Sequence, residues 1–169
     1  YFASTGLSFI DYFLADPPSV PPHHRSQFTE TVWYLPHTRL CFTPPSSDTA
    51  QAVSPLPALT HGFVTFGCFQ SYGKINHTML KLWASILQQC PNSRMIFKNS
   101  AMQDSLSKKE FISRLLDVNI PLERVVLEDI SSRHLYLAAY SQVDFMLDTF
   151  PYPGGTTTCE ALWMGVPTV

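Results

Sequence analysis

The chain has 169 residues, of which 45% are hydrophobic and 14% are charged, a composition that predicts a folded core and excludes a disordered chain. The 11 basic and 13 acidic side chains give a net charge of −2 without a basic stripe, so nothing indicates a nucleic-acid partner. No apolar run is long enough to span a bilayer.

The first part of the chain predicts little regular structure. Residues 7–14 form a short apolar stretch that fits a helix or a strand equally well, and the prolines at 17–22 disfavour any regular element. A helix or turn is expected at 28–32 and a short strand at 39–42. Residues 43–57 are rich in Pro, Ser, Thr and Ala, which is typical of a linker and predicts a domain boundary.

After the linker, apolar strands alternate with amphipathic helices at short spacing. The expected strands are 63–66, 95–97, 124–127 and 143–147, and the expected helices are 76–89, 108–116, 133–140 and 157–164. This alternation predicts βαβ units. We therefore expect an α/β fold, with a Rossmann-like parallel sheet and helices on both faces. Ligands of such sheets bind beyond the carboxyl ends of the strands.

The most informative motif follows the last of these strands. Gly154 and Gly155 precede three threonines, 156–158, that open an apolar helix. Glycines let the backbone approach a ligand, and free N–H groups at a helix start attract an anion, which Thr hydroxyls can also bind. Glu160, one turn further on, can accept hydrogen bonds from ribose hydroxyls. The motif suits a diphosphate–ribose ligand, and the alternative is an ordinary turn with a threonine cap.

Two other loops fall at the same predicted edge. Lys74 lies just before a helix and can neutralise a phosphate, with Gln70 or Ser71 beside it to form hydrogen bonds; a solvated surface lysine is the alternative. Ile130 and Ser131 end a strand, so their backbone can meet the edge of a flat base, unless the serine only caps the next helix. Less specific candidates are Lys98, His134 and Tyr136.

The four cysteines and six histidines are dispersed along the chain. There is no CxxC pair and no cysteine–histidine grouping with the spacing of a metal site. We therefore expect free thiols in a reducing compartment, which is the cytoplasm or, in a eukaryote, also the nucleus, and we expect no bound metal.

Residues 148–167 resemble the C-terminal catalytic lobe of the O-linked N-acetylglucosamine transferase family, which includes the SPINDLY-type enzymes. Three other stretches agree with the same family in the same order: residues 1–6 with 11–12, residues 34–36, and residues 69–74 followed by Leu80 and Trp83. The resemblance implies a GT-B architecture, two Rossmann-like lobes with a nucleotide-sugar donor between them. It makes this chain an internal fragment composed of the end of the N-terminal lobe (1–42), a Pro/Ser-rich linker (43–60) and an incomplete nucleotide-sugar-binding C-terminal lobe (61–169).

The family resemblance also implies an activity and its partners. The activity is inverting transfer of a sugar, here N-acetylglucosamine from UDP-GlcNAc, to Ser or Thr hydroxyls of proteins. The resemblance implies that no cofactor or metal is required and that tetratricopeptide repeats lie upstream in the full-length chain. The expected partners are a UDP-sugar donor and protein acceptors, without nucleic acid and without a membrane span.

Site roles follow from the resemblance residue by residue. Lys74 matches the lysine that contacts the diphosphate and is the expected catalytic residue. Thr156 and Thr157 match the diphosphate-binding hydroxyl pair, and Glu160 matches the acid that holds the ribose. The other expected donor-binding residues are Gln70, Ser71, Ile130, Ser131, Tyr136, Gly154, Gly155 and Thr158, and those expected on the acceptor side are Ser4, Thr5 and Gly6.

The sequence departs from the family at two positions, which keeps alternatives open. Gly155 stands where the animal enzymes carry a histidine. Tyr136 stands where that pattern also expects a histidine, with His134 two residues away. Besides the protein glycosyltransferase, the sequence allows a related enzyme with another donor, such as GDP-fucose, or with a non-protein acceptor. It also allows an inactive lobe that binds a nucleotide sugar or a partner without chemistry.

Overall fold

The computed structural model describes residues 3–46 and 52–169. The chain forms two compact units, Tyr1–Thr43 and Pro44–Val169, and each is described by itself. Part of the expected linker, residues 47–51, lies outside the described residues. Contrary to that expectation, its end forms a short helix, α1 (Pro57–His61), which Gly62 terminates in the left-handed conformation with φ of 74°.

The first unit is built on two parallel strands, β1 (Tyr12–Ala15) and β2 (Thr31–Tyr34). Between them in the chain lies a 3-10 helix, η1 (Pro22–Gln27). The proline-rich stretch therefore contains a regular turn, which the sequence analysis did not expect. Pro22 stands in the first turn of η1, where the N–H that proline lacks would have no helical partner.

Two other expectations for this unit are wrong. The helix or turn at 28–32 gives way to β2 from Thr31 on, because β-branched and aromatic residues favour an extended chain. Residues 39–42, all of which the structure describes, form no strand. The amide of Arg39 instead donates to the buried Asp16 carboxylate at 2.7 Å, so a side chain holds this segment in place of a neighbouring strand.

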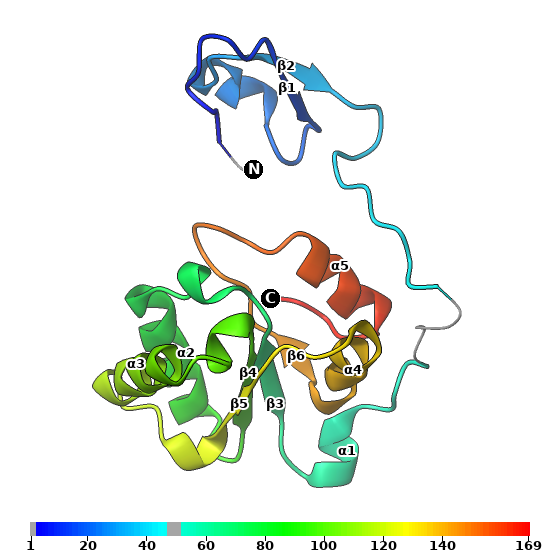
Figure 1. The fold of residues 1–169 in the computed structure, drawn as a ribbon. Helices are drawn as coiled ribbons and strands as arrows, with labels where there is room; N and C mark the ends of the chain where they lie inside the picture. Colours follow the sequence, from blue (N-terminus) through cyan, green and yellow to red (C-terminus); the bar gives the residue numbers. More distant parts are fainter. Residues whose placement is uncertain (1–2, 47–51) are drawn as a thin grey trace. The chain divides into compact units, whose positions relative to one another are not determined.

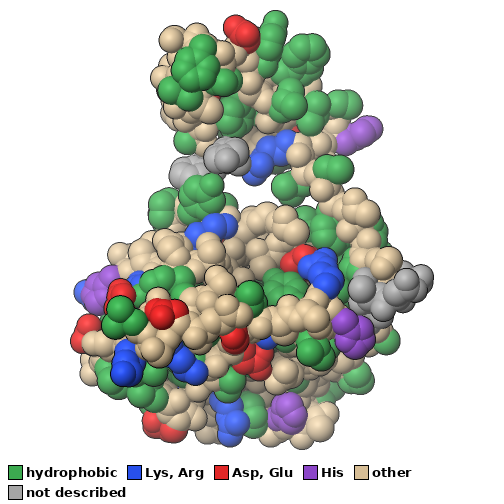
Figure 2. All heavy atoms as spheres, in the orientation of Figure 1, with side chains coloured by type: hydrophobic (Ala, Val, Ile, Leu, Met, Phe, Trp, Pro, Cys, Tyr) green, Lys and Arg blue, Asp and Glu red, His purple; other side chains and the backbone are tan. Residues whose placement is uncertain are grey.

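The small sheet of the first unit has one covered face and one exposed face. Ala15 and Val32 are buried in an apolar cluster beneath it. On the other face, Tyr12, Leu14 and Trp33 are all more than half exposed, and Figure 2 shows hydrophobic side chains at the surface of this unit. Parallel strands are usually covered on both faces, so this face is unusual for its class.

The second unit is a four-stranded parallel sheet with the order β5-β4-β3-β6 (Figure 1). The strands are β3 (Thr65–Cys68), β4 (Arg94–Lys98), β5 (Val125–Glu128) and β6 (Phe145–Met146). A single parallel bridge from Met146 to Thr168 adds the end of the chain beside β6. The predicted α/β fold with a parallel sheet is confirmed.

Helices cover both faces of this sheet. They are α2 (His77–Gln89), α3 (Ser105–Asp117), α4 (Arg133–Ala138) and α5 (Thr156–Trp163), and the 3-10 helices are η2 (Tyr72–Lys74), η3 (Ser100–Met102), η4 (Leu122–Arg124) and η5 (Ala139–Gln142). Figure 1 shows α2 and α3 on one side of the sheet and α4 and α5 on the other. Alternate residues of β4 follow this division, since Met95 and Phe97 are buried in the cluster with α2 and α3, whereas Ile96 is buried in the other cluster.

Side-chain caps and one buried carboxylate fix where the elements begin. The predicted cap of α2 is confirmed, because Asn76 Oδ1 accepts from the Met79 amide at 3.0 Å. Helix α3 begins earlier than expected, since Asp104 caps its first turn. Asp144, 1% exposed, accepts from the amides of Ala58 at 2.9 Å and Thr65 at 2.8 Å and so joins α1 to β3.

Candidate functional site

The loops that follow β3 and β6 meet at the carboxyl edge of the sheet. The Lys74 ammonium, at the end of the β3 loop, donates to the Pro153 carbonyl at 3.0 Å. The Asn76 amide, which begins α2, donates to the Phe150 carbonyl at 2.8 Å. These contacts join segments more than 70 residues apart in sequence. They place the predicted lysine beside the predicted Gly-Thr turn.

Lys74 is held by uncharged groups. Its ammonium also donates to Gln70 Oε1 at 3.3 Å and lies 4.8 Å from the centroid of the Tyr152 ring. Since neither hydrogen-bond acceptor carries a charge, neither neutralises the lysine. An open cavity of about 520 Å³ adjoins it, lined by Ser71, Gly73, Lys74, Asn76, Pro151 and Tyr152. The arrangement leaves a positive charge at the wall of a cavity.

Helix α5 begins without a side-chain cap. Its N-cap residue is Gly155, which has no side chain to accept from the first amides, so the alternative of a threonine cap is wrong. The Thr157 hydroxyl donates to Gln70 Oε1 at 3.4 Å, and the buried Thr158 hydroxyl has no hydrogen-bond partner. Unsatisfied N–H groups at a helix start carry a partial positive charge that favours an anion.

The two glycines of the turn meet different surroundings. A Cβ atom on Gly154 would lie 2.2 Å from Gln70 Nε2 and 2.5 Å from Thr158 Oγ1, whereas a Cβ on Gly155 would meet nothing within 4 Å. The Gly154 amide is also occupied, because it donates to both oxygens of Asp148, at 2.8 and 3.0 Å. Gly154 is therefore required by the protein's own packing, and Gly155 leaves open space.

Glu160 is buried, with 4% of its surface exposed, and it forms an ion pair with the Arg133 guanidinium. The pair links the start of α4, directly after the β5 loop, to the first turns of α5. Arg133 is a residue that the sequence analysis missed. The signal that could have revealed it is a cation at the start of a helix that follows the expected base-binding loop.

Tyr136 is linked to the start of α5 through a second tyrosine. Its hydroxyl lies 3.1 Å from that of Tyr140, which donates to the Thr157 carbonyl at 3.2 Å. Burial raises the pKa of both phenols well above the ordinary value, so both stay protonated. His134 is exposed on α4. Of the two alternatives, the structure connects Tyr136 to the Gly-Thr turn.

A buried lysine holds the loop after β5. The Lys98 ammonium donates to Glu128 at 3.1 Å and to the Asp129 carbonyl at 2.8 Å, so Lys98 is engaged within the protein. The Ile130 amide donates to the Asp129 carboxylate at 2.5 Å. Ser131 is exposed and Ser132, the N-cap residue of α4, makes no side-chain cap bond.

The expected acceptor-side residues lie in the first unit, where Ser4 and Thr5 contact Glu30. The hydroxyls of Thr5 and Ser4 donate to its carboxylate at 2.5 and 2.7 Å, and the Thr5 amide donates at 2.7 Å. These hydrogen bonds, with the Thr5 hydroxyl contributing most, lower the pKa of Glu30 to about 2. Gly6 follows with φ of 68°. Glu30 therefore organises the segment that the sequence analysis assigned to the acceptor.

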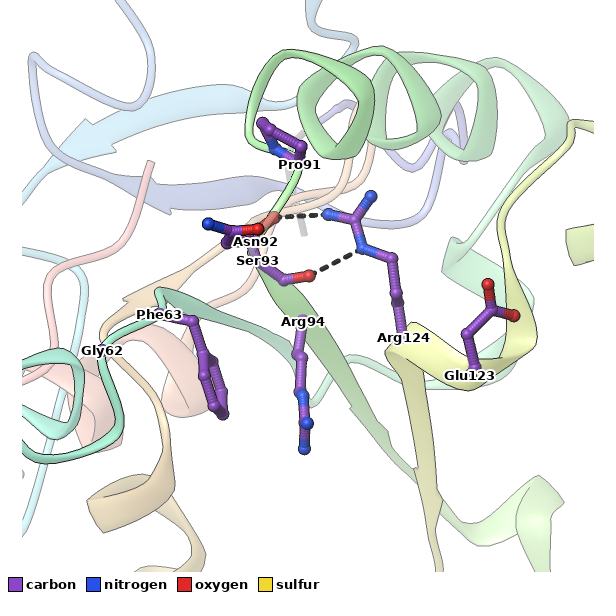
Figure 3. Close-up of a pocket in the computed structure, with 8 residues that line it drawn as sticks. All are labelled: Gly62, Phe63, Pro91, Asn92, Ser93, Arg94, Glu123 and Arg124. Carbon is purple, nitrogen blue, oxygen red and sulfur yellow. Dashed lines mark hydrogen bonds between the residues drawn. The ribbon is translucent and has the colours of Figure 1, made fainter.

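A second cavity, of about 320 Å³, lies at the amino ends of the strands (Figure 3). Arg124 donates there to the carbonyls of Ser93 and Cys90 at 2.8 and 2.7 Å, and Arg94 lies 4.4 Å from the centroid of the Phe63 ring. Arg124 thus supports the turn before β4. None of the residues expected at the site lines this cavity, so the carboxyl edge remains the candidate.

Within residues 3–46 and 52–169, no three His, Cys, Asp or Glu side chains are grouped so that they could hold a metal ion. No helix in that part of the chain has both the length and the apolar character needed to cross a membrane.

Comparisons with known proteins agree over the whole chain. SPINDLY proteins from Solanum lycopersicum and Arabidopsis thaliana, both named probable UDP-N-acetylglucosamine–peptide N-acetylglucosaminyltransferases, are 44% and 42% identical to it over 100% of its length. The chain spans only 18% of each of these relatives. The solved structure of a mutant Thermobaculum terrenum O-GlcNAc transferase superimposes with a TM-score of 0.88 at 34% identity, covering all of this chain and 31% of that one.

Residues 49–169, which include every residue of the carboxyl-edge site, match the model of glycosyl transferase family 41. Together with the similarity to the SPINDLY proteins and to the solved O-GlcNAc transferase, this match shows that the chain belongs to glycosyl transferase family 41.

Proposed function

We propose that the full-length protein is an inverting glycosyltransferase that moves N-acetylglucosamine from UDP-GlcNAc to Ser or Thr hydroxyls of protein acceptors. The names of its relatives support this activity. The observation that carries the proposal is the contact of the Lys74 ammonium with the Gly-Thr turn, 3.0 Å from the Pro153 carbonyl, directly before the uncapped start of α5.

The proposed chemistry follows from where charge develops. When the acceptor oxygen attacks the sugar, the leaving diphosphate gains negative charge. The Lys74 ammonium, the first amides of α5 and the Thr156 hydroxyl form a positive and hydrogen-bonding surface for that charge, and the Thr157 hydroxyl joins it when its proton turns from Gln70 to the ligand. These groups supply the stabilisation from the protein itself, so we propose that transfer needs no metal or other cofactor.

The remaining donor contacts are proposed around the other two loops. Glu160, oriented by Arg133, accepts from the ribose hydroxyls. The backbone at Ile130 and Ser131 meets the base, on a loop that Lys98 holds through the Asp129 carbonyl. We further infer that tetratricopeptide repeats precede this region in the full-length chain. The four cysteines of the present 169-residue chain are all free thiols, which is compatible with a cytoplasmic or nuclear location.

The direct test is Lys74→Ala in the full-length enzyme. Removing one preorganised donor from a developing oxyanion costs about 10²–10³ in rate, so we expect sugar transfer to fall by at least that factor. Lys81→Ala is the matched control, because Lys81 is exposed on α2, and we expect normal turnover from it. Near-normal transfer by the Lys74 variant would remove this lysine from the mechanism.

A binding experiment separates the donors. Calorimetric titration of the full-length protein with UDP and with GDP should show tighter binding of UDP. Tighter binding of GDP would mean that the donor is a GDP-sugar bound at the same diphosphate site. If the protein bound neither nucleotide, the inactive-lobe alternative would gain and the proposed function would fail.

A further inference from the structure

Asp148, directly beyond β6, is the most connected acceptor at the carboxyl edge. Its Oδ1 accepts from the Thr149 amide at 2.8 Å, the Gly154 amide at 2.8 Å and Gln70 Nε2 at 3.0 Å. Its Oδ2 accepts from the Gly154 amide at 3.0 Å. One carboxylate therefore closes the turn 148–154 upon itself and ties it to the loop after β3, 78 residues away in sequence.

The carboxylate also fixes which way the Gln70 amide faces. An ionised carboxylate only accepts hydrogen bonds, so the NH₂ group of Gln70 must point to Asp148. Its carbonyl oxygen then points to the Lys74 ammonium at 3.3 Å and to the Thr157 hydroxyl at 3.4 Å. Rotating the amide by half a turn would set the NH₂ group against the Lys74 ammonium and the carbonyl oxygen against the Asp148 carboxylate. Gln70 is 4% exposed and has little room to adopt another position.

Gln70 thereby brings together two groups from different elements. Lys74 ends η2 and Thr157 lies in the first turn of α5, and both donate to the same oxygen atom. Gly154 packs against the other end of the amide, where a Cβ would come within 2.2 Å of Gln70 Nε2. The cation and the hydroxyl therefore converge before any ligand arrives. Lys74 uses two of its three N–H donors on Gln70 and Pro153 and keeps the third for a ligand, which is the preorganisation that favours charge stabilisation. The Thr157 hydroxyl has one proton, which turns from Gln70 to the ligand on binding.

We propose that Asp148 is a positioning residue, which acts through the Gln70 amide to hold Lys74 and Thr157 together at the diphosphate subsite. The inference rests on the proposed function. It changes the role of Gln70 from a ligand contact, as the sequence suggested, to a buried bridge between two ligand-contacting groups. Asp148 carries the same negative charge as the ligand, and its oxygen atoms are turned toward amides of the protein.

The test uses Asp148→Asn and Gln70→Met in the full-length protein. Asp148→Asn keeps the shape but presents an NH₂ group to neighbouring donors, and Gln70→Met keeps the length but removes both ends of the bridge. Each variant is titrated with UDP and, by ligand-observed NMR, with uridine, which lacks the diphosphate. GDP and guanosine are measured in parallel. Gln88→Met, at an exposed position on α2, is the matched control.

We expect both variants to bind the nucleoside diphosphate at least tenfold more weakly, while the affinity for the nucleoside changes less than twofold. Unchanged diphosphate affinity in both variants would overturn the inference. Equal weakening for the diphosphate and the nucleoside would also overturn it, because a purely structural defect acts on the whole site. If Asp148→Asn does not fold, Gln70→Met decides, since it leaves the carboxylate and its backbone donors intact. If the wild-type protein binds no nucleotide, the proposed function itself fails.

Discussion

At the level of single residues, the two glycines before α5 allow a matched test of the turn. A methyl group on Gly154 would collide with Gln70 and Thr158, whereas one on Gly155 would enter open space. We expect Gly154→Ala to lower the free energy of unfolding by about 1–3 kcal/mol, as overpacking does, and to weaken nucleotide binding as well. Gly155→Ala should change stability by no more than about 0.5 kcal/mol.

The measurement for this pair is urea-induced unfolding of the full-length protein, with UDP titration of each folded variant. A Gly155→Ala variant that is as unstable as Gly154→Ala would contradict the packing argument, because only one of the two positions is crowded. The sequence motif assigns the same role to both glycines. The structure separates them, because only Gly154 is packed against other side chains.

A second residue-level prediction concerns pH. Hydrogen bonds from Thr5 and Ser4 lower the pKa of Glu30 from 4.5 to about 2. A carboxylate with a depressed pKa stabilises the folded state above its unfolded pKa, and this contribution is lost as the pH falls toward the folded pKa. The segment around Thr5 should therefore loosen progressively as the pH falls from about 5 toward 2.

Hydrogen exchange of the Thr5 amide, corrected for the intrinsic rate at each pH, measures this loosening. Glu30→Gln removes the titrating group, so the variant should exchange faster than the wild type at pH 7 and should show much less change between pH 5 and pH 3. Equal pH dependence in both proteins would mean that another group controls the segment.

At the level of elements, the pairing of Lys98 with Glu128 joins the ends of β4 and β5. Their side chains are 6% and 26% exposed, respectively. Removing one partner of a buried ion pair leaves an uncompensated charge and typically costs 3–5 kcal/mol. Because Glu128 is partly exposed, we expect Lys98→Met to cost about 3 kcal/mol, the lower end of that range.

Hydrogen exchange of β4 and β5 gives the local free energy of opening for this variant. The exposed Lys81→Met on α2 serves as the control and should stay within about 0.5 kcal/mol of the wild type. A Lys98 variant as stable as that control would show that the ion pair contributes little. Since Lys98 also donates to the Asp129 carbonyl, its loss should loosen the loop at 128–132 too.

The elements of the second unit could be predicted because their signals are local. A buried apolar strand, the Asn76 cap and the apolar face of α2 each depend on residues close in sequence, and the structure confirms them. The strands of the first unit could not be located, because two four-residue strands pair across 19 residues. The sequence around the first also fits a helix, and that around the second fits a helix or turn. Short elements depend on their partners more than on their own propensity.

The candidate site shows the same limit at the level of the whole molecule. The topology rule for parallel sheets correctly brought Lys74 and the Gly-Thr turn to one edge, as the 3.0 Å contact with Pro153 shows. The rule gives no side-chain partners. The roles of Arg133 and Asp148 arise from contacts with Glu160 and Gln70 that cross 27 and 78 residues of sequence, and no local pattern encodes such distances.

Ligand binding should stabilise the second unit as a whole. A ligand that binds only the folded state adds about 2.7 kcal/mol at a free concentration 100 times its Kd. We therefore expect saturating UDP to raise the midpoint of thermal unfolding of the full-length protein. Protection from hydrogen exchange should concentrate in the loops 69–76, 128–133 and 148–158, because these three segments converge on the proposed diphosphate, ribose and base.

The Lys74→Ala variant distinguishes this prediction from nonspecific stabilisation. It should keep nearly the wild-type unfolding midpoint without nucleotide, because Lys74 is only half-buried and water can replace its hydrogen bonds to Gln70 and Pro153. It should lose most of the added stability at the same UDP concentration. If UDP protected the amino edge around Arg94 and Arg124 instead, the ligand would bind in the cavity of Figure 3. The carboxyl-edge site would then be excluded even though the fold and the family remain the same.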